Sequence, residues 1–215
     1  MNAKKLKEPR AFHEPPTQRG KERWRKVVET ADRMFEELGY NNVSLAEVVR
    51  EAGGSLSTIY QWFGSKDELF LCVICDRLSG LSEAIDSIVL RGPTVQDDIE
   101  TLVETIAANS HFKLVRYALI DIHMFDAYQT KLLEVIEQNT NVPIAALFSR
   151  IRKERAVQFN ASDVELALVF VRFFRGLCFE LALYDEDMKE RMTQGKQMLV
   201  TIFTSLIQSP EGARQ

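Results

Sequence analysis

The stretch GGSLSTIYQWFGSKDEL, residues 53–69, decides the fold that this sequence predicts. Two glycines open it, and Ser55 can cap a helix that continues to Phe63. Only Ile59 and Phe63 of that helix point plainly toward a core. Ser65 then begins a capping box, which opens a further helix. The stretch therefore predicts a short helix whose remaining side chains face outward.

A second short helix precedes the glycines. Residues 44–47, Ser-Leu-Ala-Glu, read as a capping box, and the helix that they open ends at Gly53. Before it, apolar residues at three- and four-residue steps predict a first helix from about Arg19 to Leu38, with Gly39 as its C-cap. Two short helices joined by a glycine turn form a helix-turn-helix.

The outward face of the second short helix carries hydroxyl, amide and aromatic groups, and residues 55–64 contain no charged side chain. Such groups suit contacts to phosphates and base edges in a major groove, where carboxylates would be repelled. Lys66 opens the next helix, where its ammonium adds to free backbone N–H groups and favours a phosphate. We expect the DNA-binding residues to be Ser44, Ser55, Leu56, Ser57, Thr58, Tyr60, Gln61, Trp62 and Lys66.

The rest of the chain predicts an all-α protein, because no proline interrupts a periodic segment and no alternating strand pattern appears. Further helices are expected at roughly 94–109, 112–123, 127–139, 143–156, 162–184 and 187–208. We expect a flexible basic arm at 1–20, the DNA-binding domain at 21–81 with its helix-turn-helix at about 44–63, and a helical effector-binding and dimerisation domain at 82–215.

Charge, cysteines and hydropathy restrict the class of protein. The net charge is −4, yet residues 1–26 hold nine Lys or Arg against three Glu, either as a solvated tail or as a polyanion-binding arm. Cys72 and Cys75 follow a helical apolar pattern, so we expect them to be reduced core cysteines and not metal ligands. Reduced cysteines fit a cytoplasmic location. We expect no cofactor. The apolar segment 164–184 contains four charges and predicts a buried helix, with no membrane contact.

Residues 21–81 resemble the DNA-binding domain of the TetR/AcrR family of bacterial transcriptional regulators. The resemblance runs through ADRMFEELGYNNVSLAEVVREAG and STIYQWFGSKDELF. The family's usual Tyr-x-x-Phe, followed by Ser-Lys-x-x-Leu, is matched by Tyr60, Phe63, Ser65, Lys66 and Leu69. Two positions depart from the family: Gly54, where a hydrophobic residue is usual, and Ser57, where glycine is frequent.

The resemblance implies a homodimer in which the last two helices of each chain form a four-helix bundle. The sequence favours this independently, since apolar and small residues step by four and three along the last helix, as in a coiled coil. The expected dimer interface is Met188, Met192, Gly195, Leu199, Ile202 and Leu206. The alternative is a seam that packs inside one subunit.

Aromatic and thiol side chains of the body are candidates for a pocket that binds a small apolar or aromatic effector, with Arg116 or Arg175 orienting it. The candidates are Phe112, Arg116, Tyr117, Met124, Tyr128, Phe148, Phe170, Phe174, Arg175 and Cys178. The alternatives are ordinary core packing and, for the arginines, ion pairs. We expect an operator-binding repressor that the effector releases, or alternatively an architectural DNA-binding protein without an effector. No motif of an enzyme is present.

Overall fold

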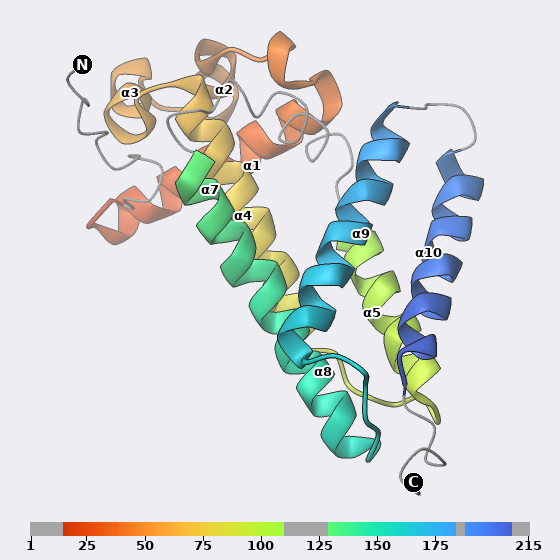
Figure 1. Ribbon diagram of the computed structural model, residues 1–215. Coiled ribbons are helices and arrows are strands. Elements are labelled where there is room, and N and C mark those ends of the chain that lie inside the picture. The colour runs from red at the N-terminus through yellow and green to blue at the C-terminus, as the bar shows by residue number, and fades with distance from the viewer. Residues whose placement is uncertain (1–14, 110–128, 184–187, 208–215) are drawn as a thin grey trace, which may run out of the picture. The chain divides into compact units, whose positions relative to one another are not determined.

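The structure, a computed structural model, describes residues 15–109, 129–183 and 188–207. These residues form helices joined by short connections, as Figure 1 shows. An isolated bridge between Phe159 and Ile207 is the one β pairing among them. The all-α fold is therefore confirmed.

The described residues divide into two compact units. One contains residues 15–77 with 129–133, and the other contains 78–109 with 134–207, apart from 184–187. The division falls inside helix α4 (Lys66–Asp86) and inside helix α7 (Gln129–Ile136). Each unit is described below by itself.

The first unit begins with α1 (Gln18–Leu38), which Thr17 caps by accepting a hydrogen bond from the Gly20 N–H. Gly39 ends this helix at a φ of 80°, a conformation that favours glycine. A 3₁₀ turn, η2 (Tyr40–Asn42), leads to α2 (Leu45–Ala52) and α3 (Leu56–Phe63). These helices confirm the expected order, and the observed bounds differ from the expected ones by one or two residues.

The core of this unit is formed by the predicted inward faces. Val27, Val28 and Ala31 of α1 are buried, and Phe35 packs edge-on against Phe70 of α4 at 5.2 Å between ring centroids. Leu38, which the periodicity also placed on the inner face, is 51% exposed. Leu38 is the last residue of the helix, so no further helical turn covers it.

The second unit contains α5 (Val95–Asn109), α8 (Val142–Glu154), α9 (Asp163–Leu183) and α10 (Met188–Ser205). The helix expected at 127–139 proves to be α7 followed by a π-helical turn, η4 (Glu137–Asn141). That turn comes directly before α8, whose second residue, Pro143, has no N–H to donate to the helical ladder. The helix expected at 112–123 lies outside the described residues.

A cluster of phenyl rings holds the second unit together. Phe148 of α8 stacks on Phe203 of α10 at 5.5 Å, and Phe170 of α9 meets the same ring edge-on at 5.2 Å. All three side chains are fully buried. At 150–250 Å² of buried surface for each ring, these contacts provide much of the unit's hydrophobic stabilisation.

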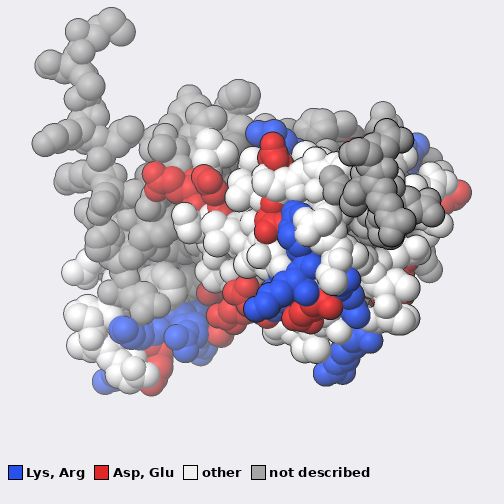
Figure 2. Space-filling view, turned by 60° about the horizontal axis from the view of Figure 1, so that its bottom comes forward, with Lys and Arg blue, Asp and Glu red and all other residues white. Residues whose placement is uncertain are grey.

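Two arginines at the C-terminal end of α8 form ion pairs, Arg152 in its last turn and Arg155 as its C-cap. Arg155 donates to both carboxylate oxygens of Asp98, which is 1% exposed, while Arg152 binds Asp163 and the Ala161 carbonyl. On the face drawn in Figure 2, basic side chains lie next to acidic ones in the same manner.

None of the described helices is both long enough and apolar enough to cross a membrane. Cys72 and Cys178 are buried, and burial raises the pKa of both thiols, that of Cys178 to about 12. Cys75 is partly exposed. The two buried thiols therefore pack as small apolar side chains.

Candidate nucleic-acid interface

The α2–α3 segment is built from two hydrogen-bonded caps and a glycine turn. The Ser44 backbone N–H and hydroxyl both donate to the Glu47 carboxylate, and the Glu47 N–H donates back to the Ser44 hydroxyl. Gly53 and Gly54 then adopt φ values of 80° and 121°, which side-chain-bearing residues rarely adopt. Ser55 accepts from the Thr58 N–H and starts α3. The expected helix-turn-helix is present at the expected residues.

Helix α3 is anchored by two side chains and exposes the others. Ile59 and Phe63 are fully buried, whereas Leu56 is 38% and Tyr60 49% exposed. A short helix with no charged side chain and an exposed outer face can enter the major groove of DNA. Of the nine expected DNA-binding residues, Ser44, Ser55, Leu56, Ser57, Tyr60 and Gln61 are exposed, and Thr58, Trp62 and Lys66 are partly exposed.

Four of these residues line one open groove of about 560 Å³ beside α3. Leu56 and Tyr60 come from α3, Ser44 is the N-cap of α2, and Lys66 is the first residue of α4. The lining includes hydroxyl groups, an ammonium and an aromatic ring, together with the Glu47 carboxylate, which is hydrogen-bonded to Ser44. Hydroxyl and ammonium groups of this kind form most protein contacts to DNA phosphates.

The Lys66 ammonium has a partner inside the protein that the sequence did not reveal. It donates to the Tyr40 carbonyl at 3.0 Å and lies 4.2 Å from the centroid of the Tyr40 ring. The Tyr40 hydroxyl in turn donates to the Asp67 carboxylate. Lys66 therefore ties η2 to the start of α4, and one of its three donors is used internally. Its contact to phosphate stays a prediction.

A second contact that sequence reasoning missed joins α1 to α4. The Arg77 guanidinium donates to Asp32 at 2.6 Å and also pairs with Glu36. Burial raises the pKa of the Asp32 carboxyl despite this pair. Asp32 and Glu36 lie four residues apart and therefore on one face of α1. This spacing is the only feature of the local sequence that indicates that both acids could pair with one arginine.

Helix α10 carries five of the six residues expected at the dimer interface, and Leu206 follows its last residue. Gly195 and Leu199 are buried within the chain, and Met192, Ile202 and Leu206 are partly exposed. A Cβ atom placed on Gly195 would lie 2.4 Å from Leu177 Cδ1 of α9. The close helix approach predicted at Gly195 is thus present, with α9 of the same chain as its partner. The side chain of Met188 lies outside the described residues, and the interface stays a prediction.

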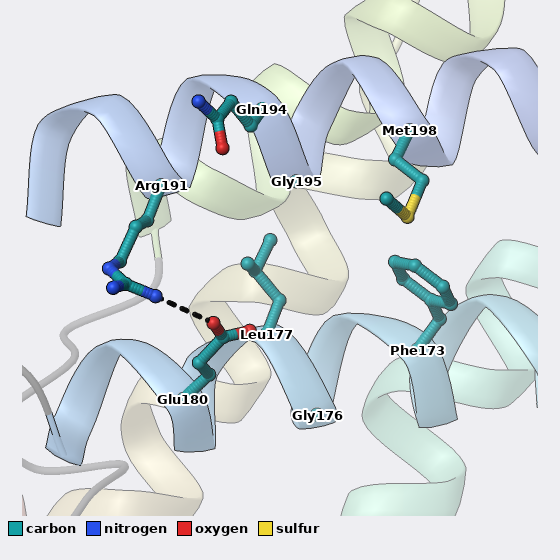
Figure 3. Close-up of a pocket in the computed structure, with 8 residues that line it drawn as sticks. All are labelled: Phe173, Gly176, Leu177, Glu180, Arg191, Gln194, Gly195 and Met198. Atoms are coloured by element: carbon teal, nitrogen blue, oxygen red, sulfur yellow. Dashed lines mark hydrogen bonds and ion pairs between the residues drawn. The ribbon is translucent and has the colours of Figure 1, made fainter.

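Beside this contact an open groove of about 380 Å³ runs between α9 and α10. Figure 3 shows Phe173 facing Met198 at one end of the groove and the Glu180–Arg191 ion pair at the other. In that pair Arg191 Nη1 lies 3.0 Å from Glu180 Oε1. Gly176, on α9, leaves space in the groove because it has no side chain. The apolar side chains that line this groove are only partly covered by the rest of the chain.

The expected effector residues separate into three groups. Phe148, Phe170, Phe174 and Cys178 are buried, and the first two belong to the packed ring cluster. Arg175 lies on the exposed side of α9. Phe112, Arg116, Tyr117, Met124 and Tyr128 lie outside the described residues. The structure therefore brings no complete effector pocket together among the residues it describes.

Comparison with known proteins agrees with the helix-turn-helix. Residues 27–73 match the family "Bacterial regulatory proteins, tetR family". The chain is 31% identical over 64 residues to the HTH-type transcriptional regulator HbdR of Aromatoleum sp. (strain CIB), covering 30% of this chain and 28% of that protein. It is 24% identical over 121 residues to an HTH-type transcriptional regulator of Staphylococcus aureus (strain USA300), covering 56% and 57%. These matches span less than two thirds of either relative.

Solved structures resemble the chain over a greater length. A TetR-family transcriptional regulator from Pectobacterium atrosepticum superposes with a TM-score of 0.69 at 18% identity, covering 90% of this chain and 99% of that one. One from Mesorhizobium loti gives a TM-score of 0.66 at 18% identity, covering 90% and 100%. At such identities the similarity shows a shared fold. The family match, on the capped helix-turn-helix, therefore identifies residues 27–73 as the helix-turn-helix segment of a TetR-family transcriptional regulator.

Proposed function

We propose that this protein is a repressor that binds a near-palindromic operator as a homodimer and leaves it when a small molecule binds. The observation that carries the DNA-binding part is the exposed, uncharged face of α3, held by Ile59 and Phe63 and bordered by the groove that contains Lys66. Such a helix can approach base edges without repelling the phosphates on either side.

The homodimer is supported by the unpartnered face of α9 and α10. Val169 of α9 and Met198 of α10 are 46% and 54% exposed. Phe173 and Gly176 border the open groove between the two helices. The same face of a second copy can cover these groups in a two-fold arrangement. A dimer would then present two α3 helices to half-sites separated by one or more turns of about 34 Å.

Size measurement by light scattering tests the dimer with two matched glycine variants. Gly176 and Gly80 each lie in a helix where an added Cβ meets no atom within 4 Å, and only Gly176 borders the groove. Gly176→Leu should dissociate the dimer at micromolar concentration, whereas Gly80→Leu should leave it intact. A dimer that tolerates Gly176→Leu would place the interface elsewhere.

Effector release is supported by the aromatic and thiol groups of the body, among which Phe174 and Cys178 are buried near the exposed Arg175. A ligand releases DNA only if it binds the DNA-incompetent form better, and tenfold release requires about 1.4 kcal/mol of differential affinity. Small aromatic and amphipathic compounds should be screened for a raised melting temperature. Hits must also weaken DNA binding, and Phe174→Ala should reduce both effects.

The DNA directly upstream of the protein's own gene provides the first test of DNA binding. Fluorescence anisotropy should show tighter binding to that duplex than to a random duplex of the same length, and Gln61→Ala should reduce the difference. Equal affinity for both duplexes, together with no stabilising compound, would favour the architectural alternative. Failure to bind either duplex would reject the proposal.

A further inference from the structure

The N-terminal part of α1 carries several cationic side chains that lie outside the α2–α3 segment. Arg19, Arg23, Arg25 and Lys26 are exposed, and within the described part of the chain none of the four lies within ion-pair distance of a carboxylate. The nearby carboxylate Glu22 accepts a hydrogen bond from Gln18 at 3.0 Å. This segment therefore differs from the compensated arginines of α8.

Position along the helix divides these cations between two sides. Residues 19, 23 and 26 follow steps of four and three and share one side, whereas Arg25 points about 200° away from Arg23. Trp24 lies between them and stacks on Phe63 of α3, with ring centroids 5.8 Å apart. That contact fixes the rotation of α1 about its own axis relative to α3.

The Arg23 side lies at the α2–α3 turn. A Cβ atom on Gly54 would be 4.0 Å from both Cδ and Nε of Arg23, so the Arg23 side chain runs alongside this glycine. Gly54 has no side chain to cover it, and the next residue, Ser55, is the N-cap of α3. The nearest acidic residue on α2, Glu51, is paired with Arg33. Among the residues that the structure describes, the exposed Arg23 guanidinium thus has no carboxylate partner beside the start of α3.

We propose that Arg23, with Arg19 and Lys26 on the same side of α1, forms a phosphate-binding strip that extends the DNA interface beyond the α2–α3 segment. The inference rests on the proposed DNA-binding function. A duplex that receives the first residues of α3 in its major groove carries phosphates along the edge of that groove. A strip that contacts phosphates positions the protein on DNA and carries no base preference. It also provides local positive charge in a chain whose net charge is −4.

Salt-dependent binding of the full-length protein tests the strip. Wild type, Arg23→Ala, Arg23→Lys and Arg25→Ala are titrated by fluorescence anisotropy against the upstream duplex and a random duplex over a range of salt concentrations. Each lost phosphate contact lowers the slope of log K against log salt by about 0.9, hence by about 1.8 for a dimer with two strips. Arg23→Ala should show this decrease on both duplexes and leave their affinity ratio unchanged.

The two other variants separate a local contact from a general loss of charge. Arg25→Ala removes the same charge from the opposite side of α1 and should keep the wild-type slope. Arg23→Lys should recover most of the slope, because an ammonium also neutralises a phosphate. Equal decreases for Arg23→Ala and Arg25→Ala, or an unchanged slope for Arg23→Ala in a wild type that binds, would overturn the strip alone. A wild type that binds neither duplex would reject the proposed function and the strip together.

Discussion

Trp24 of α1 stacks on Phe63 of α3, with ring centroids 5.8 Å apart and ring planes 24° apart. Phe63 is fully buried, and this pair joins α1 to the last residue of α3. The orientation of α3 therefore depends on a contact between residues nearly forty positions apart in the chain.

Trp24→Ala should lower the free energy of unfolding by about 2 kcal/mol, less than for a fully buried tryptophan because Trp24 is partly exposed. Urea denaturation followed by circular dichroism measures the change. Trp24→Phe keeps a ring against Phe63 and should retain most of the stability. If Trp24→Phe is as destabilised as Trp24→Ala, the stacked contact is not the stabilising feature.

Lys66→Ala should have two separable effects. Loss of the hydrogen bond to Tyr40 and of the ammonium above its ring should lower the free energy of unfolding by about 1–2 kcal/mol. Loss of a phosphate contact should also lower the salt slope of DNA binding by about 0.9 per contact. A destabilised variant with an unchanged slope would leave Lys66 only its internal role.

Gln61→Ala should change sequence preference and leave the salt slope unchanged. Gln61 is exposed in the middle of α3, and a side-chain amide can pair with adenine through two hydrogen bonds, a contact that discriminates by about 1–3 kcal/mol. Binding to a set of operator duplexes with single base changes measures this. Uniform weakening across the set would argue against a base contact.

Gly195→Ala should destabilise the fold, because its Cβ would lie 2.4 Å from Leu177 Cδ1. Overpacking costs about 1–3 kcal/mol, and the gain in helix propensity offsets about 1 kcal/mol of it. Gly80→Ala, where the added methyl group meets no atom within 4 Å, is the control and should stabilise α4. Gly195→Leu should be worse than Gly195→Ala. Equal gains from the two alanine variants would contradict the close approach.

Glu47 should contribute stability that is lost in acid. Hydrogen bonds from the Ser44 hydroxyl and backbone N–H lower the pKa of the Glu47 carboxyl in the folded protein. The contribution is therefore complete above the unfolded pKa of about 4.3 and disappears as pH falls through the lower folded pKa. Glu47→Gln should be less stable than wild type at neutral pH, and the difference should shrink in acid. Urea denaturation at several pH values measures it, and a difference independent of pH would contradict the assignment.

The sequence by itself determined the helices of the DNA-binding segment and their ends. Ser44, Gly53 and Ser55 act within one helical turn of their own positions, so the capping box, the glycine turn and the second cap could be predicted from neighbouring residues. The inward positions of Ile59 and Phe63 followed from helical spacing for the same reason. The π-helical turn before Pro143 was missed, because its wider hydrogen-bonding pattern has no distinct residue signal.

Only the tertiary structure decided which distant residues meet. Lys66 lies on Tyr40, Gly195 packs against Leu177, and Arg23 lies beside Gly54. Each pair is separated by 18 or more positions, and helical periodicity specifies the face of a side chain but not the neighbour that this face receives. The packing of helices against one another selects that neighbour. It thereby gave Lys66, expected to bind phosphate, an internal partner in Tyr40, and placed Gly195, expected at the dimer interface, against Leu177 of the same chain.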